Sequence, residues 1–181
     1  MKSKNLKFIE FMLFGSGPKN FKIIGTEERE NFYYYLFKKY NFEPKIIEYS
    51  INRKTYKGFK RIFLVIIQFY SSIMHPIVFG IYKRNYDLIR CKQIYGSWSG
   101  LILKIISKKK LIIRVGYSWS QSILHENGIK SPKYLVSIII ERFLLNNADG
   151  IVVSSKYLYD KFNKLNSKII NVPNGINLQK F

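Results

Sequence analysis

Short apolar segments alternate with longer amphipathic segments along most of this 181-residue chain. The short segments are rich in Ile, Val and Phe and are bounded by Gly, Pro or polar residues, which is the pattern of β-strands. Because they are nearly continuous in apolar residues, they indicate parallel strands that are covered on both faces. We expect strands at residues 8–14, 45–49, 86–91, 110–115, 150–153 and 168–172.

Helices are predicted between these strands. Thr26 is a suitable N-cap for a helix that would end near Tyr40, and Pro132 stands where another helix could begin. The segment between residues 116 and 131 is expected to be a polar loop. The remaining helices are predicted at residues 59–82, 96–106, 133–146 and 156–165. This alternation of strands and helices predicts an α/β, Rossmann-like domain with a parallel sheet and helices on both faces.

The apolar stretch from Ile62 to Tyr82 is long enough to span a bilayer. Polar residues and Pro76 interrupt its middle, and proline breaks or kinks a helix. We therefore expect a buried helix, a break at Pro76 and a second short helix rather than a membrane span. Contact with an anionic membrane surface stays open as a milder alternative.

Residues 1–17 imitate a signal peptide, but Glu10 interrupts the apolar run, so we favour a first strand there.

The charge of the chain favours anionic partners. It has 31 basic and 11 acidic residues, for a net charge of +20. Lysines account for 24 of the 31, whereas specific recognition of phosphates or bases relies more on Arg, so nucleic acid is the less favoured partner.

Cys91 is the only cysteine and excludes an intrachain disulfide, which favours the cytoplasm, either free or peripheral at the inner membrane surface. The two histidines are too few for a metal cluster, so we expect no metal.

Ligands of parallel α/β sheets bind beyond the carboxyl ends of the strands, so the loops there are the candidate sites. Gly15 and Gly17 follow the first predicted strand, and Gly25 with Thr26 opens the first helix. Small residues and free helical N–H groups at such points let a phosphate or sugar approach the backbone. A simple turn and an ordinary helix cap are the alternatives. The spacing of these glycines is not that of a dinucleotide-binding loop.

A second candidate is the segment Arg114–Ser120, at the end of the predicted strand 110–115. It combines a guanidinium group, the rings of Tyr117 and Trp119, and two serine hydroxyls. Aromatic rings that stack on sugar faces, next to polar groups that bind hydroxyls, suit carbohydrate binding. The segment 95–99 has a similar composition. The alternative is an aromatic loop that covers the core.

The carboxyl-terminal third resembles the end of the amino-terminal domain of family 4 glycosyltransferases, which have the GT-B fold. The matching features are Ala148-Asp149, an apolar strand that ends in Ser154, and the later segment Pro173–Asn177 followed by Phe181. Gly25-Thr26-Glu27-Glu28-Arg29 is similar to the family's opening of its first helix, and Tyr86-Asp87-Leu88-Ile89 is similar to the strand after it.

The resemblance implies transfer of a sugar from a nucleotide-sugar donor to a glycan or lipid-linked acceptor, usually with retention and without a bound metal or other cofactor. Residues 1–172 would be the acceptor-side domain, and residues 173–181 would begin the linker to a carboxyl-terminal nucleotide-binding half. Without that half, which could be a separate chain, we expect no activity. The alternative is a basic protein with a vestigial Rossmann-like fold that binds nucleic acid or membrane surfaces.

The resemblance also suggests roles for the candidate residues. Gly15, Gly17, Gly25 and Thr26 would lie near the donor phosphates or the acceptor, and Arg114, Tyr117 and Trp119 would line the cleft. Many relatives carry a histidine after the strand that ends here in Arg114-Val115-Gly116-Tyr117. Because this chain lacks it, we name no catalytic residue.

Overall fold

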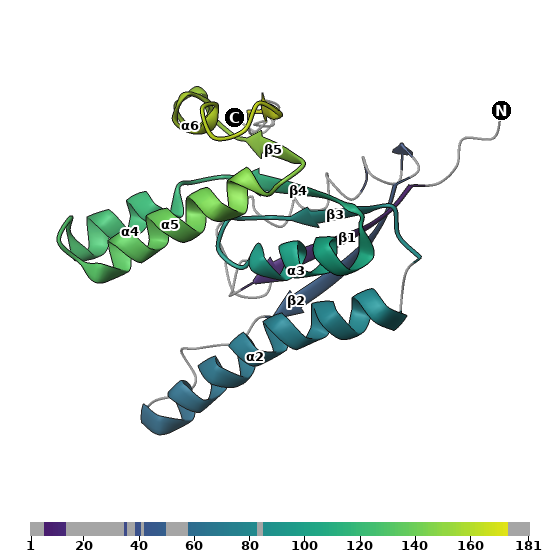
Figure 1. The fold of residues 1–181 in the computed structure, drawn as a ribbon, viewed down its shortest axis with the longest axis horizontal. Helices are drawn as coiled ribbons and strands as arrows, with labels where there is room; N and C mark the ends of the chain where they lie inside the picture. Colours follow the sequence, from purple (N-terminus) through teal and green to yellow (C-terminus); the bar gives the residue numbers. More distant parts are fainter. Residues whose placement is uncertain are drawn as a thin grey trace, which may run out of the picture. The chain divides into compact units, whose positions relative to one another are not determined.

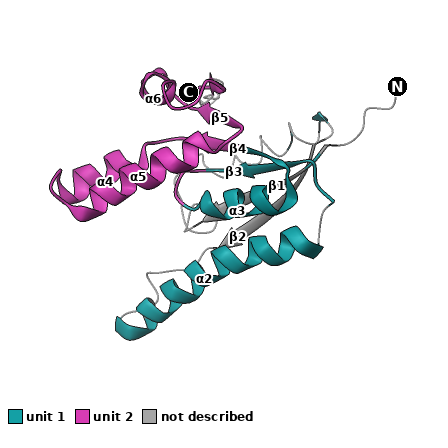
Figure 2. Cartoon of the chain, in the orientation of Figure 1, with its two compact units in different colours: residues 1–92, 96–111 teal, residues 93–95, 112–181 magenta. Residues whose placement is uncertain are grey.

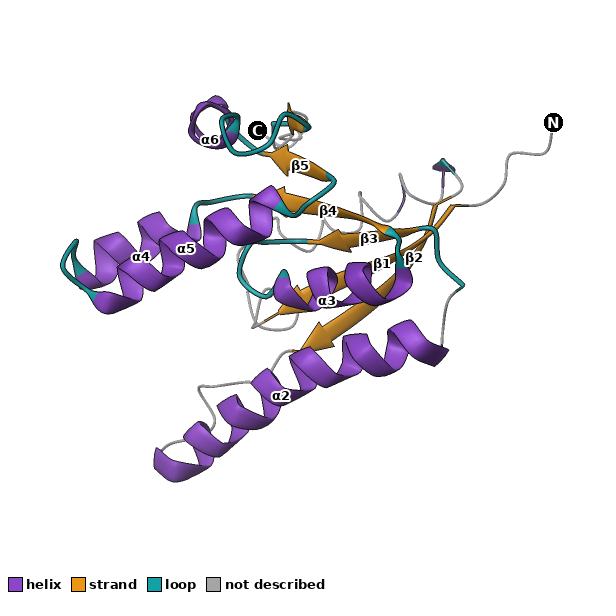
Figure 3. Cartoon of the chain, in the orientation of Figure 1, coloured by secondary structure: helices purple, strands orange, loops and turns teal. Residues whose placement is uncertain are grey.

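The computed structural model describes residues 6–13, 35, 39–40, 42–49, 58–82 and 85–173. The chain divides into two compact units: unit 1 holds residues 1–92 and 96–111, and unit 2 holds residues 93–95 and 112–181 (Figure 2). Each unit contains parallel strands and helices (Figure 3). The prediction of an α/β, Rossmann-like fold with a parallel sheet is therefore confirmed.

The described part of unit 1 contains three strands in the order β2-β1-β3 (Figure 1). Both neighbouring pairs are parallel; Leu6 is in register with Phe42 and Phe8 with Leu88. The long helix α2 connects β2 to β3 in the sequence. The elements are β1 (Leu6–Leu13), β2 (Phe42–Tyr49), α2 (Gly58–Tyr82), β3 (Leu88–Cys91) and α3 (Trp98–Ser107).

Helix α3 lies close against the strands of unit 1 because Gly100 has no side chain. A Cβ atom there would collide with Cys91 Sγ and would lie 2.9 Å from Leu111 Cδ1. Ile89, Cys91 and Leu111 are fully buried beside it. Small-residue contact thus sets the separation of helix and sheet in this part of the core.

Unit 2 contains parallel strands in the order β4-β5-β6, with Ile112 in register with Gly150 and Ile151 with Ile169. Every second residue of β4 and β5 is buried, and α5 buries Ser137, Glu141, Leu144 and Leu145. The elements are β4 (Lys110–Val115, which begins in unit 1), α4 (Trp119–Asn127), α5 (Pro132–Asn146), β5 (Gly150–Val153), α6 (Lys156–Phe162) and β6 (Ile169–Asn171). The sequence-based bounds of β4, β5 and α5 are confirmed.

The predicted break at Pro76 is wrong, because α2 runs without interruption through it. Proline has no N–H, so it leaves the carbonyl four residues earlier without its helical partner. That carbonyl belongs to Ser72, and the Ser99 hydroxyl of α3 donates to it at 2.7 Å. A hydrogen bond from the neighbouring helix thus replaces the one that the proline removes.

The predicted burial of this helix is also wrong. Large apolar side chains along α2 are exposed, among them Phe59 at 81% and Ile66 at 59%. Among the described residues, α2 is the one helix that is long and apolar enough to cross a membrane. Length and composition alone do not separate a membrane helix from a core helix; the contacts of α2 bear on that choice.

The expected polar loop at residues 116–131 is wrong in part, because residues 119–127 form α4. The sequence of α4 has little apolar periodicity, and tertiary contacts described below hold its first turn. The helix predicted at residues 26–40 lies outside the described residues except for 35, 39 and 40. Residues 174–181 also lie outside them, so the boundary predicted near residue 172 stays a prediction.

Candidate functional site

The candidate site lies within unit 2, where the chain turns after β4. The N–H of Gly116 donates to Gln93 Oε1 at 3.1 Å, and its carbonyl accepts from the Ser154 hydroxyl at 3.2 Å. A Cβ atom on Gly116 would lie 3.0 Å from Gln93 Nε2. The backbone of this turn is therefore joined to the segment 93–95 and to the residue that follows β5.

Three aromatic residues lie at or beside this turn, and we call Tyr95, Tyr117 and Trp119 the aromatic cluster. The rings of Tyr95 and Trp119 are tilted by 52° with centroids 5.1 Å apart, which is a favourable aromatic arrangement. The side chain of Tyr117 is 47% exposed. The cluster thus presents aromatic surface and phenolic hydroxyls together.

The protonation of Tyr117 fits a role as a hydrogen-bond donor. Burial raises the pKa of Tyr117 above 10.0, and the nearby Tyr95 and Glu126 raise it further. A phenolate there would lose hydration and would lie close to other negative charge. Tyr117 is therefore a neutral phenol at physiological pH, able to donate one hydrogen bond and to accept others.

A buried carboxylate holds the first turn of α4 in place. Glu141 of α5 accepts hydrogen bonds from the backbone N–H of Ser120 at 3.0 Å and from its hydroxyl at 2.8 Å. Both oxygens of Glu141 also lie 3.2 Å from the hydroxyl of Ser118. The side chain of Glu141 is only 4% exposed. Because a buried carboxylate needs several donors, this arrangement fixes where α4 begins.

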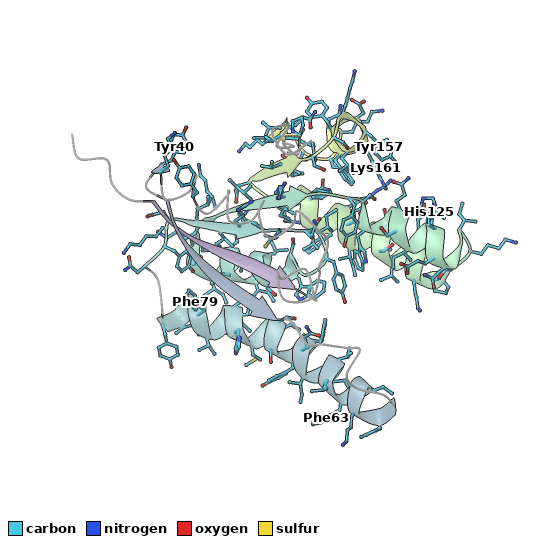
Figure 4. All side chains as sticks on the ribbon, turned by 180° about the vertical axis from the view of Figure 1, so that it is seen from behind. Tyr40, Phe63, Phe79, His125, Tyr157 and Lys161 are labelled. Carbon is cyan, nitrogen blue, oxygen red and sulfur yellow. The ribbon has the colours of Figure 1, made fainter. Side chains whose placement is uncertain are left out.

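Ser118 also joins α4 to α6. Lys161 Nζ donates to the Ser118 hydroxyl oxygen at 2.6 Å and lies 3.8 Å from Glu141 Oε1. Ser118 also caps α4, since its oxygen accepts from the N–H of Gln121. One donor and two acceptor lone pairs are what a hydroxyl offers, so all three contacts are compatible. Figure 4 shows Lys161 next to Tyr157 on α6, and the Tyr157 hydroxyl donates to Gln121 Oε1 at 2.8 Å.

The structure brings together two of the seven residues that the sequence nominates, Tyr117 and Trp119. Arg114 lies within β4, in register with Val152 and partly buried, on the opposite side of the strand from Ile113 and Val115. It therefore precedes the turn rather than forming part of it. Gly15, Gly17, Gly25 and Thr26 lie outside the described residues.

Sequence reasoning missed Gln93, Glu141 and Lys161. A signal for Glu141 was present: it shares a helical face with Ser137, Leu144 and Leu145, all of which are buried. A lone acidic residue on an apolar face requires partners, and Ser118 and Ser120 are those partners. Among the described residues, no group of three or more His, Cys, Asp or Glu residues could hold a metal ion.

Solved structures resemble this fold. Sucrose-phosphate synthase from Thermosynechococcus elongatus matches 97% of this chain with a TM-score of 0.63 and 14% identity, over 50% of its own length. HepE from Anabaena, in complex with UDP and glucose, matches 96% of this chain with a TM-score of 0.55 and 12% identity, over 46% of its length. HepE in complex with UDP-glucose matches with a TM-score of 0.53, 12% identity and 96% coverage, over 45% of its length.

These neighbours are glycosyltransferases with the GT-B fold. At such low identity the likeness shows the fold, and membership of family 4 stays a prediction. The chain spans half the length of the first neighbour and slightly less of the second. No protein-family model and no curated protein matches the chain.

Proposed function

We propose that this chain is the acceptor-side domain of a GT-B glycosyltransferase and that its aromatic cluster binds a sugar. The observation that carries the proposal is the pairing of Tyr95 with Trp119 beside the half-exposed Tyr117, at a turn beyond the carboxyl end of a parallel strand. Parallel α/β sheets bind their ligands in that position. The C–H groups of a sugar face pack on aromatic rings, and its hydroxyls accept and donate hydrogen bonds.

The reaction in this proposal is transfer of a glycosyl group from a nucleotide sugar to a glycan or lipid-linked acceptor, with retention at the anomeric carbon. HepE, one of the structural neighbours, is described in complex with UDP and glucose and with UDP-glucose, which supports a nucleotide sugar as donor. Gly15, Gly17, Gly25 and Thr26 are proposed donor or acceptor contacts on sequence alone.

The contribution of this chain to transfer is positioning. Gln93, Ser154 and Glu141 hold the turn that carries the aromatic cluster, so the rings are already oriented before a sugar binds. The developing charge of a glycosyl cation and of a departing nucleotide diphosphate requires preorganised polar groups. We propose that a second, nucleotide-binding domain supplies those groups, because the neighbours are about twice as long as this chain.

Sugar binding can be tested without turnover. Saturation-transfer NMR on this chain, with a panel of nucleotide sugars and free sugars, reports which of them touch the protein. We expect Trp119→Ala to weaken the binding of a responding sugar by about tenfold or more, since loss of one stacked ring corresponds to about 1.4 kcal/mol. Tyr117→Phe keeps the ring and removes the hydroxyl, so it separates stacking from hydrogen bonding.

Tyr70→Ala is the control, because Tyr70 is an exposed aromatic residue on α2 in the other unit. It should leave sugar binding unchanged. Absence of contact with every sugar in the panel would contradict the proposed site, as would equal effects of Trp119→Ala and Tyr70→Ala. Turnover of a nucleotide sugar by this chain alone would contradict the proposed need for a second domain.

A further inference from the structure

The buried positions of α2 are polar or small, although Phe69 also packs on Trp98 of α3. Gln68, Ser72, Pro76 and Gly80 recur every four residues, which places them along one face of the helix, and all four are buried. The Ser72 hydroxyl accepts from Trp98 Nε1 at 2.9 Å. The inward face of α2 therefore lacks the large aliphatic side chains that a helix usually buries.

Gly80 allows the two helices to approach closely. A Cβ atom on Gly80 would lie 2.8 Å from Ile106 Cγ2 and 3.0 Å from Leu103 Cδ1, distances that real contacts do not sustain without movement. Small residues and interhelical hydrogen bonds of this kind are the usual means by which helices pack in apolar surroundings. They are also compatible with a soluble protein, so the exposed side of α2 decides the matter.

The side of α2 next to this buried row is apolar and exposed, most fully in the first half of the helix. We define this outer face as the stripe of six residues that lie within a third of the helical circumference and are all more than half exposed: Phe59, Ile62, Phe63, Ile66, Tyr70 and Ile81. Figure 4 shows Phe63 at the end of α2 that is far from Phe79. The helix thus exposes large apolar side chains while it buries Gln68 and Ser72, whereas a surface helix in water turns its polar side outward.

The charges around α2 indicate what covers this face. The sequence contains no Asp or Glu between Glu48 and Asp87, so the whole helix and both flanks lack negative charge. Basic residues stand before the helix, in its first turn and just after it: Arg53, Lys54, Lys57, Lys60, Arg61, Lys83 and Arg84. An apolar stripe with aromatic residues and a purely basic border matches the interface of an anionic membrane.

We propose that the outer face of α2 lies in the interfacial region of an anionic lipid bilayer, with the helix parallel to the membrane and α3 on its protein side. The apolar stripe enters the boundary between headgroups and acyl chains, and the positive charge of the flanking sequence attracts the chain to lipid phosphates. The hydrogen bonds of Ser72 with Trp98 and Ser99 keep the inward face of α2 on the protein, which favours a helix that lies on the bilayer over one that crosses it. This inference stands independently of the proposed sugar transfer.

A matched pair of substitutions tests the face. Ile66 on the outer face of α2 is 59% exposed, and Ile105 on α3 is 61% exposed in the same unit. Co-sedimentation of the whole chain with vesicles of phosphatidylcholine, with and without phosphatidylglycerol, measures binding. We expect binding to the mixed vesicles, a loss of about tenfold or more for Ile66→Glu, and little change for Ile105→Glu, since removing a buried Ile from lipid costs at least one decade in affinity.

The same experiment contains the results that would overturn the proposal. Equal losses for the two glutamate variants, or binding that salt abolishes and Ile66→Glu does not affect, would mean that charge alone attracts the chain. Failure to bind mixed vesicles would exclude a membrane as the partner. If the chain is instead a dimer that Ile66→Glu dissociates in analytical ultracentrifugation, a second copy covers the face.

A depth measurement separates a helix that lies on the membrane from one that crosses it. Residues 63 and 81 are 18 positions apart on the outer face, or about 27 Å along the helix axis. The tryptophan fluorescence that Phe63→Trp or Ile81→Trp adds to that of the parent chain can be quenched by lipids brominated at known acyl positions. The bromine position that quenches most strongly reports the depth of that residue. Equal, shallow depths support the proposal. Clearly different depths would show that α2 spans the bilayer and would refute the parallel arrangement.

Discussion

The hydroxyl of Ser99 donates to the carbonyl oxygen of Ser72, the atom that Pro76 deprives of its helical hydrogen bond. The distance is 2.7 Å and both serines are fully buried. A proline in the middle of a helix is normally disruptive because it leaves this carbonyl unsatisfied. Here a side chain from α3 satisfies it, and α2 continues for six more residues after Pro76.

This relationship predicts an interaction between two substitutions. Ser99→Ala should lower the free energy of unfolding by about 2 kcal/mol, because it leaves a buried carbonyl unsatisfied. In a Pro76→Ala background the same change should cost less than about 1 kcal/mol, since residue 76 then supplies the N–H. Urea denaturation of the four proteins of this double-mutant cycle measures the coupling. Equal costs in the two backgrounds would contradict the explanation.

Glu141 makes a second prediction about stability. Glu141→Ala removes the acceptor for the N–H and hydroxyl of Ser120 and leaves Lys161 without its carboxylate. We expect a loss of about 3 kcal/mol in the free energy of unfolding, in the range known for breaking buried charged groups. Arg142→Ala is the control on the next residue, which is exposed, and should change stability by less than about 0.5 kcal/mol. Similar losses for the two variants would argue against the buried network.

Tyr117 gives a prediction about pH. Its folded-state pKa is raised above 10.0 by burial, so the folded chain favours the neutral phenol. The stability that this phenol contributes is complete below pH 10 and is lost as the pH rises through the folded-state pKa, because the unfolded chain ionises first. Ultraviolet titration measures the formation of tyrosinate in the parent chain and in Tyr117→Phe. The difference between the two titrations should show that Tyr117 ionises above pH 10. A transition at or below pH 10 would contradict the burial of this hydroxyl.

Gly100 gives a prediction about packing. In Gly100→Ala the added methyl group would collide with Cys91 Sγ and crowd Leu111. Overpacking costs about 1–3 kcal/mol, of which the higher helix propensity of Ala recovers up to about 1 kcal/mol, so we expect a net loss in thermal and urea stability. Gly150→Ala is the matched control, because its nearest neighbours would lie at ordinary distances of 3.7 and 3.8 Å. If both substitutions were tolerated equally, α3 would not lie as close to the strands as described.

Much of the fold could be predicted from local patterns. The strands β4 and β5 are short runs rich in Ile and Val, and the helix α5 has a clear start signal in Pro132. Helix α4 could not be predicted in this way, because its apolar residues are few. Its first turn is held by the cap of Ser118 and by Glu141, which stands more than twenty residues later in the sequence.

The candidate site was predictable only in composition. Tyr117 and Trp119 stand out as aromatic residues after a strand, and the structure adds Tyr95 as the ring next to Trp119. Arg114 was expected with them, and it lies one residue before the end of β4 with its side chain on the other face from the buried Ile113 and Val115. The supporting residues Gln93 and Lys161 come from distant segments, and no local pattern links them to the turn.

The sequence by itself determined the fold class, most of the strands and helices after residue 85, and the basic charge. These follow from local periodicity and composition, which act over a few residues. Only the tertiary structure decided that α2 continues through Pro76 and presents its apolar side outward, and that Glu141 orders the turn beneath the aromatic cluster. The physical reason is that a buried polar group must find a partner, and the partners of Ser72 and Glu141 lie more than twenty residues away in the chain.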